Sequence, residues 1–200
     1  GTDTVKFAAG SQTIGSLSYN SSSNATMKLG SNVNIANKLT LTKGTMELSN
    51  NSNLTMNAGA EIEREEGMLS ITSGSSFVGT ASYDVTYKGA SKNSGVELTG
   101  SGLNDLSLQL STSNDSITIN NNIDVNGTLD LSSGTFNMNG YDVEIMGDFS
   151  AQASGYMSGN SQSNLVISTG GSLTDTIRFM VGREYLDSLI INTITNADIV

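Results

Sequence analysis

The chain has 200 residues, a net charge of −10 and no His, Cys, Pro or Trp. Without imidazole or thiolate groups it has no means to build a zinc site, a disulfide, or a Ser–His or Cys–His nucleophile. Asp and Glu outnumber Lys and Arg by 19 to 9, which argues against nucleic-acid binding, and no apolar run reaches the roughly 18 residues that predict a membrane span.

Ser, Thr, Asn and Gly together make up nearly half of the chain. Disordered chains have similar compositions, but here the apolar residues fall in short alternating runs, which place every second side chain on one face of a strand. The gaps between runs are rich in turn-forming Gly, Asn and Ser. No segment has helical periodicity, so we predict an all-β fold. In chain order, the clearest predicted strands include residues 5–7, 27–29, 33–35, 39–41, 54–56, 117–119, 123–125, 129–131 and 143–145.

The sequence also repeats itself. Residues 2–20 (TDTVKFAAGSQTIGSLSYN) are similar to residues 174–192 (TDTIRFMVGREYLDSLIIN), and residues 24–48 are similar to residues 114–138. These offsets indicate a unit of about 86 residues. Because neither end has the polar cap that a solenoid needs, we expect a segment of a longer chain. The predicted organisation is a single segment over 1–200 with internal repeats at approximately 14–102, 103–185 and 186–200, the last one partial.

Within a unit, matching apolar residues recur at a shorter step of 21 residues, in the sets Met27, Leu48 and Leu69; Leu41 and Ile62; and Met56 and Phe77. A step of about 21 residues with three short strands predicts one coil of a right-handed parallel β-helix, and the chain would form about nine coils. The absence of Pro agrees with strands that are paired on both sides. Gly44 and Gly134, which follow Leu-x-Leu runs, are predicted to be turn residues with positive φ.

Two acidic patches are the candidate metal sites. The first consists of Glu61, Glu63, Glu65 and Glu66 around Arg64, and calcium binding is one interpretation, since this cation takes several carboxylate oxygens. No D-x-D-x-D-G loop is present, so we favour a solvated edge. The second patch consists of Asp130, Asp142, Glu144 and Asp148. Its equivalents in the first repeat are mostly uncharged, which favours chance surface charge. No metal site and no cofactor are predicted.

Catalysis on a β-helix would need either two carboxylates in a cleft or acidic metal ligands with a cationic base. The cationic candidates are Arg178, Arg183, Lys88 and Lys92. No loop insertion ties any of them to an acidic cluster, so we predict no catalytic residues and no enzyme activity.

Aromatic side chains are the remaining candidates for binding, because their rings stack on sugar rings. They are Tyr19, Tyr83, Tyr87, Tyr141, Tyr156 and Tyr185. Tyr83 and Tyr87 flank Val85, so the three side chains share one side of a strand. We favour core or rim filling over sugar binding for these tyrosines.

Three segments resemble a known family. The stretches IANKLTLTKGTMELSNNSNLTMNAGAEI, VNGTLDLSSGTFNMNGYDVEIMGDF and GNSQSNLVISTGGSLTDTIRFMVGREYLDSLIIN are similar to β-helical repeats of very large secreted and cell-surface proteins of Bacteroidetes. The typical phrase there is a strand followed by G-T-L-x-L-x-x-G-T-x-x-x-x-G-x-x-L-x-L. The resemblance implies type IX secretion, an extracellular or cell-surface location, and a role as adhesin, stalk or appendage. It carries no catalytic residues, because the shared positions are apolar or turn residues.

We therefore expect a structural or adhesive segment of a very large extracellular or cell-surface repeat protein. The partners considered are further copies of the chain, in an oligomer or fibre, and a glycan or cell-surface target. One alternative is a carbohydrate-binding or polysaccharide-degrading β-helix. The other is a segment of a phage tail or of an autotransporter passenger, which would have the same architecture in another biological setting.

Overall fold

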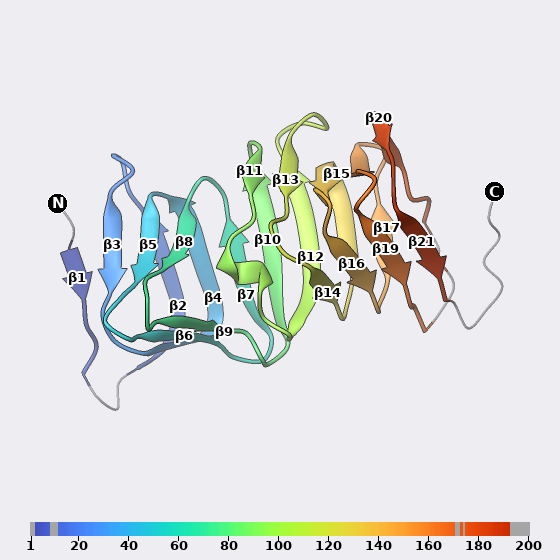
Figure 1. Ribbon diagram of the computed structural model, residues 1–200. Helices are drawn as coiled ribbons and strands as arrows, with labels where there is room; N and C mark the ends of the chain where they lie inside the picture. Colours follow the sequence, from blue (N-terminus) through green and yellow to red (C-terminus); the bar gives the residue numbers. More distant parts are fainter. Residues whose placement is uncertain (1–2, 9–11, 171–172, 174, 193–200) are drawn as a thin grey trace. The chain divides into compact units, whose positions relative to one another are not determined.

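The computed structural model describes residues 3–8, 12–170, 173 and 175–192. In these residues the chain forms parallel strands, one short 3-10 turn and no α-helix, and the strands stack as a β-solenoid (Figure 1). The predicted all-β parallel solenoid is thus confirmed. It has about eight turns with a spacing of about 22 residues, slightly fewer and longer coils than predicted. No helix of the described residues has the length and apolar character needed to cross a membrane.

The chain divides into two compact units, residues 1–88 with 95–103 and residues 89–94 with 104–200. Three parallel ladders of strands form the first unit (Figure 1). Its first ladder consists of β1 (Asp3–Val5), β3 (Thr26–Leu29), β5 (Thr45–Leu48) and β8 (Met68–Ile71). Its second ladder consists of the first residues of β2 (Thr13–Asn20) and β4 (Val33–Lys43), then β6 (Asn53–Met56) and β9 (Ser76–Val78). Its third ladder consists of the later residues of β2 and β4, then β7 (Ala60–Arg64) and β10 (Tyr83–Gly89). The 3-10 turn η1 (Val96–Leu98) also belongs to this unit.

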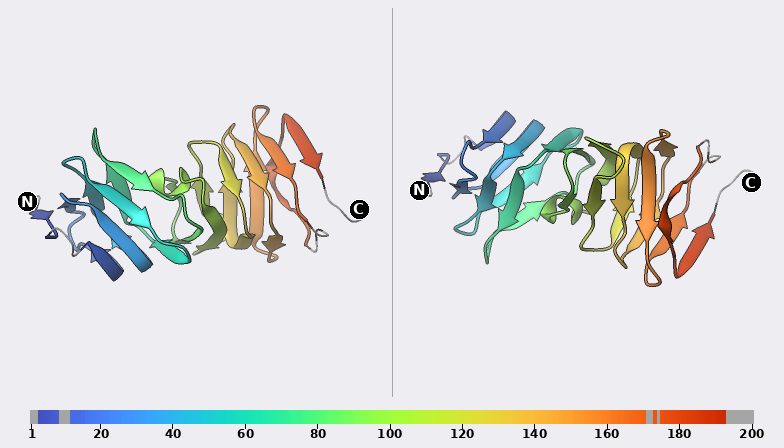
Figure 2. Two further views of the ribbon diagram at one scale, coloured as in Figure 1. Left: turned by 90° about the horizontal axis from the view of Figure 1, so that it is seen from below. Right: turned by 90° about the horizontal axis from the view of Figure 1, so that it is seen from above.

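The second unit is built in the same way, with neighbouring strands of each ladder side by side (Figure 2). Its first ladder consists of β11 (Lys92–Asn93), β13 (Ser116–Thr118), the later residues of β15 (Leu129–Asn137), β18 (Gly155–Gly159) and β20 (Phe179–Glu184). Its second ladder consists of β12 (Leu103–Leu110), the first residues of β15, and β17 (Phe149–Ala151). Its third ladder consists of β14 (Ile123–Val125), β16 (Asp142–Ile145), β19 (Asn164–Ile167) and β21 (Ser188–Ile191).

The apolar residues of the alternating runs form the interior of each unit. Leu39 and Leu41 of β4 are fully buried, and so are Leu129 and Leu131, which stand at the matching positions 90 residues later. Thr40, between the two leucines of β4, is partly exposed. The inward and outward positions therefore follow the predicted alternation in both units, because successive side chains of a strand point to opposite faces.

The residue-by-residue pairing does not keep a constant step of 21 residues. The pairs depart from that step by two residues: Met27 pairs with Met46, Leu39 with Ile62, and Leu54 with Phe77. The reason is that coils differ in length. β4 passes from the second to the third ladder without a turn, whereas residues 57–59 form a turn at the same place in the next coil. A displacement of two equals the side-chain period of a strand, so the predicted inward faces are unaffected.

Two glycines have the positive φ predicted for them, Gly44 between β4 and β5 and Gly134 within β15. Gly44 has φ +91° and Gly134 has φ +103°, a region that side chains disfavour. A Cβ atom on Gly44 would also lie 2.8 Å from the carbonyl oxygen of Ala25. Four asparagines adopt positive φ as well, which explains part of the high Asn content, since Asn tolerates this conformation better than most residues. They are Asn24, Asn50, Asn51 and Asn139.

The predicted repeats at the two ends of the chain are only partly covered by the described residues. Of the partial repeat at 186–200, residues 193–200 lie outside the described residues, as do parts of the segments 2–20 and 174–192. Where the two segments are described, their strands differ in exposure. Leu17 is half-buried beside Leu39, whereas its match Leu189 is 49% exposed beside Leu165. The repeat boundaries remain a prediction.

Candidate functional site

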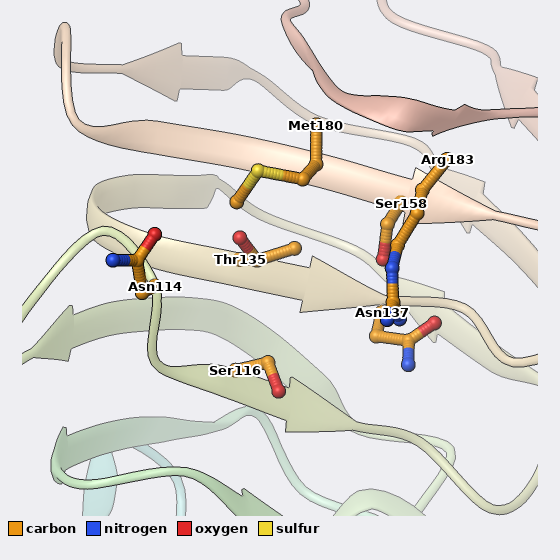
Figure 3. Close-up of a pocket in the computed structure, with 7 residues that line it drawn as sticks. All are labelled: Asn114, Ser116, Thr135, Asn137, Ser158, Met180 and Arg183. Carbon is orange, nitrogen blue, oxygen red and sulfur yellow. The ribbon is translucent and has the colours of Figure 1, made fainter.

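A pocket of about 260 Å³ opens on the outer surface of the first ladder of the second unit (Figure 3). Its walls come from the turn before β13 and from β13, β15, β18 and β20. The lining residues are Asn114, Ser116, Thr135, Asn137, Ser158, Met180 and Arg183. Residues from four successive coils thus line one small, mostly polar depression.

A β-bulge opens this pocket. On β18, Met157 and Gly159 are two residues apart, but their partners on β20, Phe179 and Glu184, are five apart. Extra residues in one strand bend it away from its neighbour, and Gly182 within the bulge has φ +78°. The bulge residues Met180 and Arg183 form the wall on the β20 side (Figure 3).

Hydrogen bonds hold the floor of the pocket. The Asn137 side chain donates from Nδ2 to Thr118 Oγ1 over 3.2 Å and accepts at Oδ1 from the Asn139 amide over 3.1 Å. The Thr135 hydroxyl donates to the Ser113 carbonyl oxygen over 3.3 Å. These bonds set the orientation of both side chains before any ligand is bound.

Two groups of the pocket lack partners among the described residues. Ser158 is only 1% exposed, and its Oγ makes no hydrogen bond there. Arg183 is the single charged side chain of the lining and forms no ion pair with a described residue. Figure 3 shows it extending from β20 toward Ser158 and Asn137. The pocket therefore offers a cation, an unused hydroxyl and the oriented amide of Asn137.

The first predicted acidic patch is split by the structure. Glu61 and Glu63 lie on the outer face of β7, as expected for residues two apart. Lys38 Nζ lies 3.2 Å from a Glu61 oxygen and 2.8 Å from Glu63, and Lys88 Nζ lies 2.7 Å from Glu63. The bond from Lys38, then that from Lys88, lowers the pKa of Glu63, and the same bond to Glu63 raises the pKa of Lys38.

Lysines thus pair with Glu61 and Glu63, two of the carboxylates that were candidate calcium ligands. Glu65 and Glu66 lie in the turn after β7, and Glu66 is 3.9 Å from Lys43 Nζ. No group of three or more acidic side chains in the described residues is arranged to hold a metal ion.

Arg64 of the same patch points inward instead. It is 5% exposed and donates to Glu97, which is fully buried in η1, and to the Gly67 carbonyl oxygen. The Glu97 carboxylate also accepts the Tyr87 hydroxyl over 2.6 Å, and the Glu97 carbonyl accepts the Tyr83 hydroxyl over 2.8 Å. Burial raises the pKa of Tyr83 and of Tyr87. Burial alone would lower the pKa of Arg64, but Glu97 and Tyr87 raise it.

This buried cluster of Arg64, Tyr83, Tyr87 and Glu97 was not predicted. One signal for it was present, because Arg64 continues the inward alternation of Ala60 and Ile62. Glu97 carried no such signal, since it lies outside the strands. The core-filling interpretation of Tyr83 and Tyr87 is confirmed by their complete burial.

The second acidic patch is also divided. Asp130 lies on the second ladder of the second unit, where Ser107 and Ser132 donate to it over 3.1 and 2.7 Å. Asp142 and Glu144 lie on the third ladder, and Asp124 is the strand neighbour of Glu144. Asp148 lies in the turn before β17.

A polar column crosses this third ladder. Asp142 accepts from Asn122 over 3.3 Å and from Asn164 over 2.7 Å, and Ser188 donates to Asn164 over 2.6 Å. The column borders an open groove that also contains Asp124, Glu144, Val166 and Ile190. Its hydrogen bonds join four successive coils on the outside of the stack.

The other sequence candidates bind backbone carbonyl oxygens or lie at the surface. Lys92 donates to the Ala90 carbonyl oxygen, and Arg178 to that of Ala151 over 3.4 Å. Tyr19 donates to the Ala25 carbonyl oxygen over 2.8 Å. Tyr185 is 66% exposed, and Tyr141 and Tyr156 are partly exposed.

The fold defines the chain as a parallel β-solenoid protein. No protein-family model, curated protein or solved structure matches it.

Proposed function

We propose that this chain is a structural and adhesive segment of a very large extracellular or cell-surface repeat protein, of the kind that Bacteroidetes export by type IX secretion. The observation that carries the proposal is the contrast between inward and outward residues. Leu39 and Leu41 recur as Leu129 and Leu131, all buried, while outward Thr40 becomes Asp130. The residues that recur between repeats are those that maintain the scaffold, whereas the surface residues vary.

The connections between coils support a load-bearing role. Within each unit backbone ladders join neighbouring coils, for example where β3 pairs with β5 and β4 pairs with β6 and β7. Side-chain contacts reinforce them, for example the Asn122, Asp142, Asn164 and Ser188 column and the Lys38 and Glu63 pair. In solenoids, stability is roughly a sum of such neighbour contacts, so coils yield one after another under load.

Single-molecule pulling tests this role. We expect the 200-residue chain to unfold in discrete force peaks, each releasing about one coil of 22 residues, or about 70–80 Å of extended chain. A variant with Leu54, a fully buried residue, changed to Asp should lose the peaks of the coils next to β6. Extension of the unmodified chain without force peaks would remove the load-bearing role.

The proposal includes the absence of enzyme activity. Arg178 donates to a backbone carbonyl oxygen and Lys88 is bound to Glu63, and no group of three or more acidic side chains among the described residues is arranged to hold the metal ion of a lyase-type site. A reducing-sugar assay on a panel of polysaccharides tests this part. Turnover by the chain would favour the polysaccharide-degrading alternative.

The biological setting needs a different measurement. Sequencing a few hundred residues on either side of this segment separates the settings, because type IX cargo carries a C-terminal sorting domain, whereas phage tails and autotransporters carry their own assembly or translocation domains. Electron microscopy of the purified chain tests whether copies associate into a fibre. Surface labelling of intact cells tests the proposed location.

A further inference from the structure

The pocket on the first ladder of the second unit has the features of a site for a singly charged anion. Arg183 is its one charged group, and a guanidinium binds carboxylates through two parallel hydrogen bonds. Because Arg183 is the one charged side chain of the lining, the pocket offers a single counter-charge, which suits a ligand group with one negative charge.

The remaining lining matches a ligand that carries hydroxyl groups. Ser116, Thr135 and Ser158 present hydroxyls, and Asn114 and Asn137 present amides. Such groups both donate and accept hydrogen bonds, as sugar hydroxyls do. The Asn137 amide is already oriented by Thr118 and Asn139.

Ser158 is the second, independent sign of a ligand. Its hydroxyl is almost fully buried, has no partner in the described residues and lines the pocket beside Arg183 (Figure 3). A buried polar group without a hydrogen bond destabilises a fold by about 1–3 kcal/mol. A ligand oxygen that bound this hydroxyl would remove that cost.

The volume of the pocket and its apolar wall restrict the size of the ligand. The pocket volume of about 260 Å³ lies just below the range of about 300–1,000 Å³ for drug-sized ligands, which suits a single sugar ring. The thioether of Met180 provides an apolar wall, against which the C–H groups of a ring pack. A bare inorganic anion would leave most of this space and this wall unused.

We propose that this pocket binds the hexuronate unit of an acidic polysaccharide, with the sugar carboxylate on Arg183, a sugar hydroxyl on Ser158 and the ring against Met180. A bound uronate would be the ligand of the proposed adhesive role, and in this respect the inference rests on the proposed function. Pulling and binding are separate measurements, so a chain that fails as a scaffold can still bind uronate, and a stiff chain can fail to bind it.

Titration calorimetry on the 200-residue chain tests the site with oligogalacturonates and with neutral galactose oligomers of equal length. For one small unit we expect a dissociation constant on the order of 1 mM with the uronates and at least tenfold weaker binding of the neutral oligomers. Sodium phosphate and sodium sulfate serve as further probes. No heat with oligogalacturonate, equal affinity for the neutral oligomers, or tighter binding of phosphate would each overturn the proposal.

A pair of arginine variants tests whether uronate binds in this pocket. Arg183→Gln should weaken uronate binding about tenfold or more, as expected when a hydrogen bond to a charged group is lost. Arg178→Gln is the matched control, since Arg178 is a neighbouring arginine that does not line the pocket, and it should bind like the unmodified chain. Equal affinity of the two Arg variants would overturn the site.

Ser158→Ala separates a binding hydroxyl from a merely structural one. Because the hydroxyl has no hydrogen-bond partner in the part of the chain that the structure describes, its removal should raise the melting temperature. Because we expect it to bind the sugar, the same variant should bind uronate more weakly. Opposite changes in stability and affinity support the proposal. A raised melting temperature with unchanged affinity would show that Ser158 takes no part in binding and would overturn its assigned role.

Discussion

Glu63 and Arg64 are adjacent charged residues of β7 with opposite surroundings. Glu63 is paired at the surface with Lys38 and Lys88, while Arg64 is buried with Glu97. Pairs at the surface are worth little, because water already screens their charges. A buried pair resists the loss of one partner much more strongly, because the other charge is left without compensation in a medium of low polarity.

We therefore expect Arg64→Met to lower the free energy of unfolding by about 3–5 kcal/mol, against at most about 1 kcal/mol for each surface pair lost in Glu63→Gln. Urea denaturation at neutral pH measures both. Similar losses for the two variants would show that Arg64 is hydrated in solution.

Tyr87 predicts how stability responds to alkaline pH. Burial, then the neighbouring Glu97 carboxylate, raises its pKa well above the usual value of 10.0. Above about pH 10 the unfolded chain loses the tyrosine proton while the folded chain keeps it. The folded state then binds more protons, so stability present below pH 10 is lost as the pH rises.

Tyr87→Phe should remove part of this loss between about pH 9 and pH 11 and should reduce stability at neutral pH by about 1–3 kcal/mol, the value of a hydrogen bond to a charged group. Tyr185→Phe is the control, because Tyr185 is 66% exposed. Urea denaturation across this pH range measures both, and identical slopes for the two variants would contradict the burial of Tyr87.

At the scale of a strand, alternation decides the effect of a substitution. In β6, Leu54 is fully buried, whereas its neighbour Thr55 is partly exposed beside the uncharged residues Asn34 and Val78. Leu54→Asp should cost several kcal/mol, since it leaves an unpaired charge in an apolar interior. Thr55→Asp should change stability by less than about 1 kcal/mol. Circular dichroism during urea denaturation compares the two, and equal effects would show that the face assignment is wrong.

Alternation also explains which parts of the fold the sequence could predict. The inward residues of β4 and β15 follow from a period of two, which survives any even displacement. The pairing departs by two residues from the constant step of 21, since it depends on turn lengths that vary between coils, such as the turn at 57–59. The positive φ of Gly44 and Gly134 could be predicted because the two glycines recur at matching positions.

The candidate sites were harder to predict, for reasons that differ between them. Ser116, Thr135 and Ser158 of the pocket are common uncharged residues from separate coils, and only the bulge in β20 makes their surface concave. Arg183 was considered as a base for catalysis, but the pocket that it lines contains no carboxylate. The pattern of neighbouring residues in the sequence does not predict such a bulge.

At the scale of the whole molecule, the two compact units predict that damage stays local. In a solenoid each coil contacts only its neighbours. Leu54→Asp should therefore accelerate amide hydrogen exchange in residues 26–88 and leave residues 104–170 unchanged, and Ile145→Asp, which alters a buried residue of β16, should do the reverse. Hydrogen exchange followed by mass spectrometry measures this. Faster exchange throughout the chain in either variant would mean that the units unfold together.

The unequal coil lengths have a consequence for protein engineering. The coil that contains residues 57–59 accommodates a turn that the preceding coil lacks, while Leu39 and Ile62 still meet across the two coils. Exposed turns are the places where chains best accept inserted segments. A foreign epitope grafted at 57–59 would project sideways from an intact frame, and grafts at turns of successive coils would be spaced by multiples of the strand separation, about 4.8 Å. The turns of the chain are thus sites at which peptides can be displayed at defined intervals.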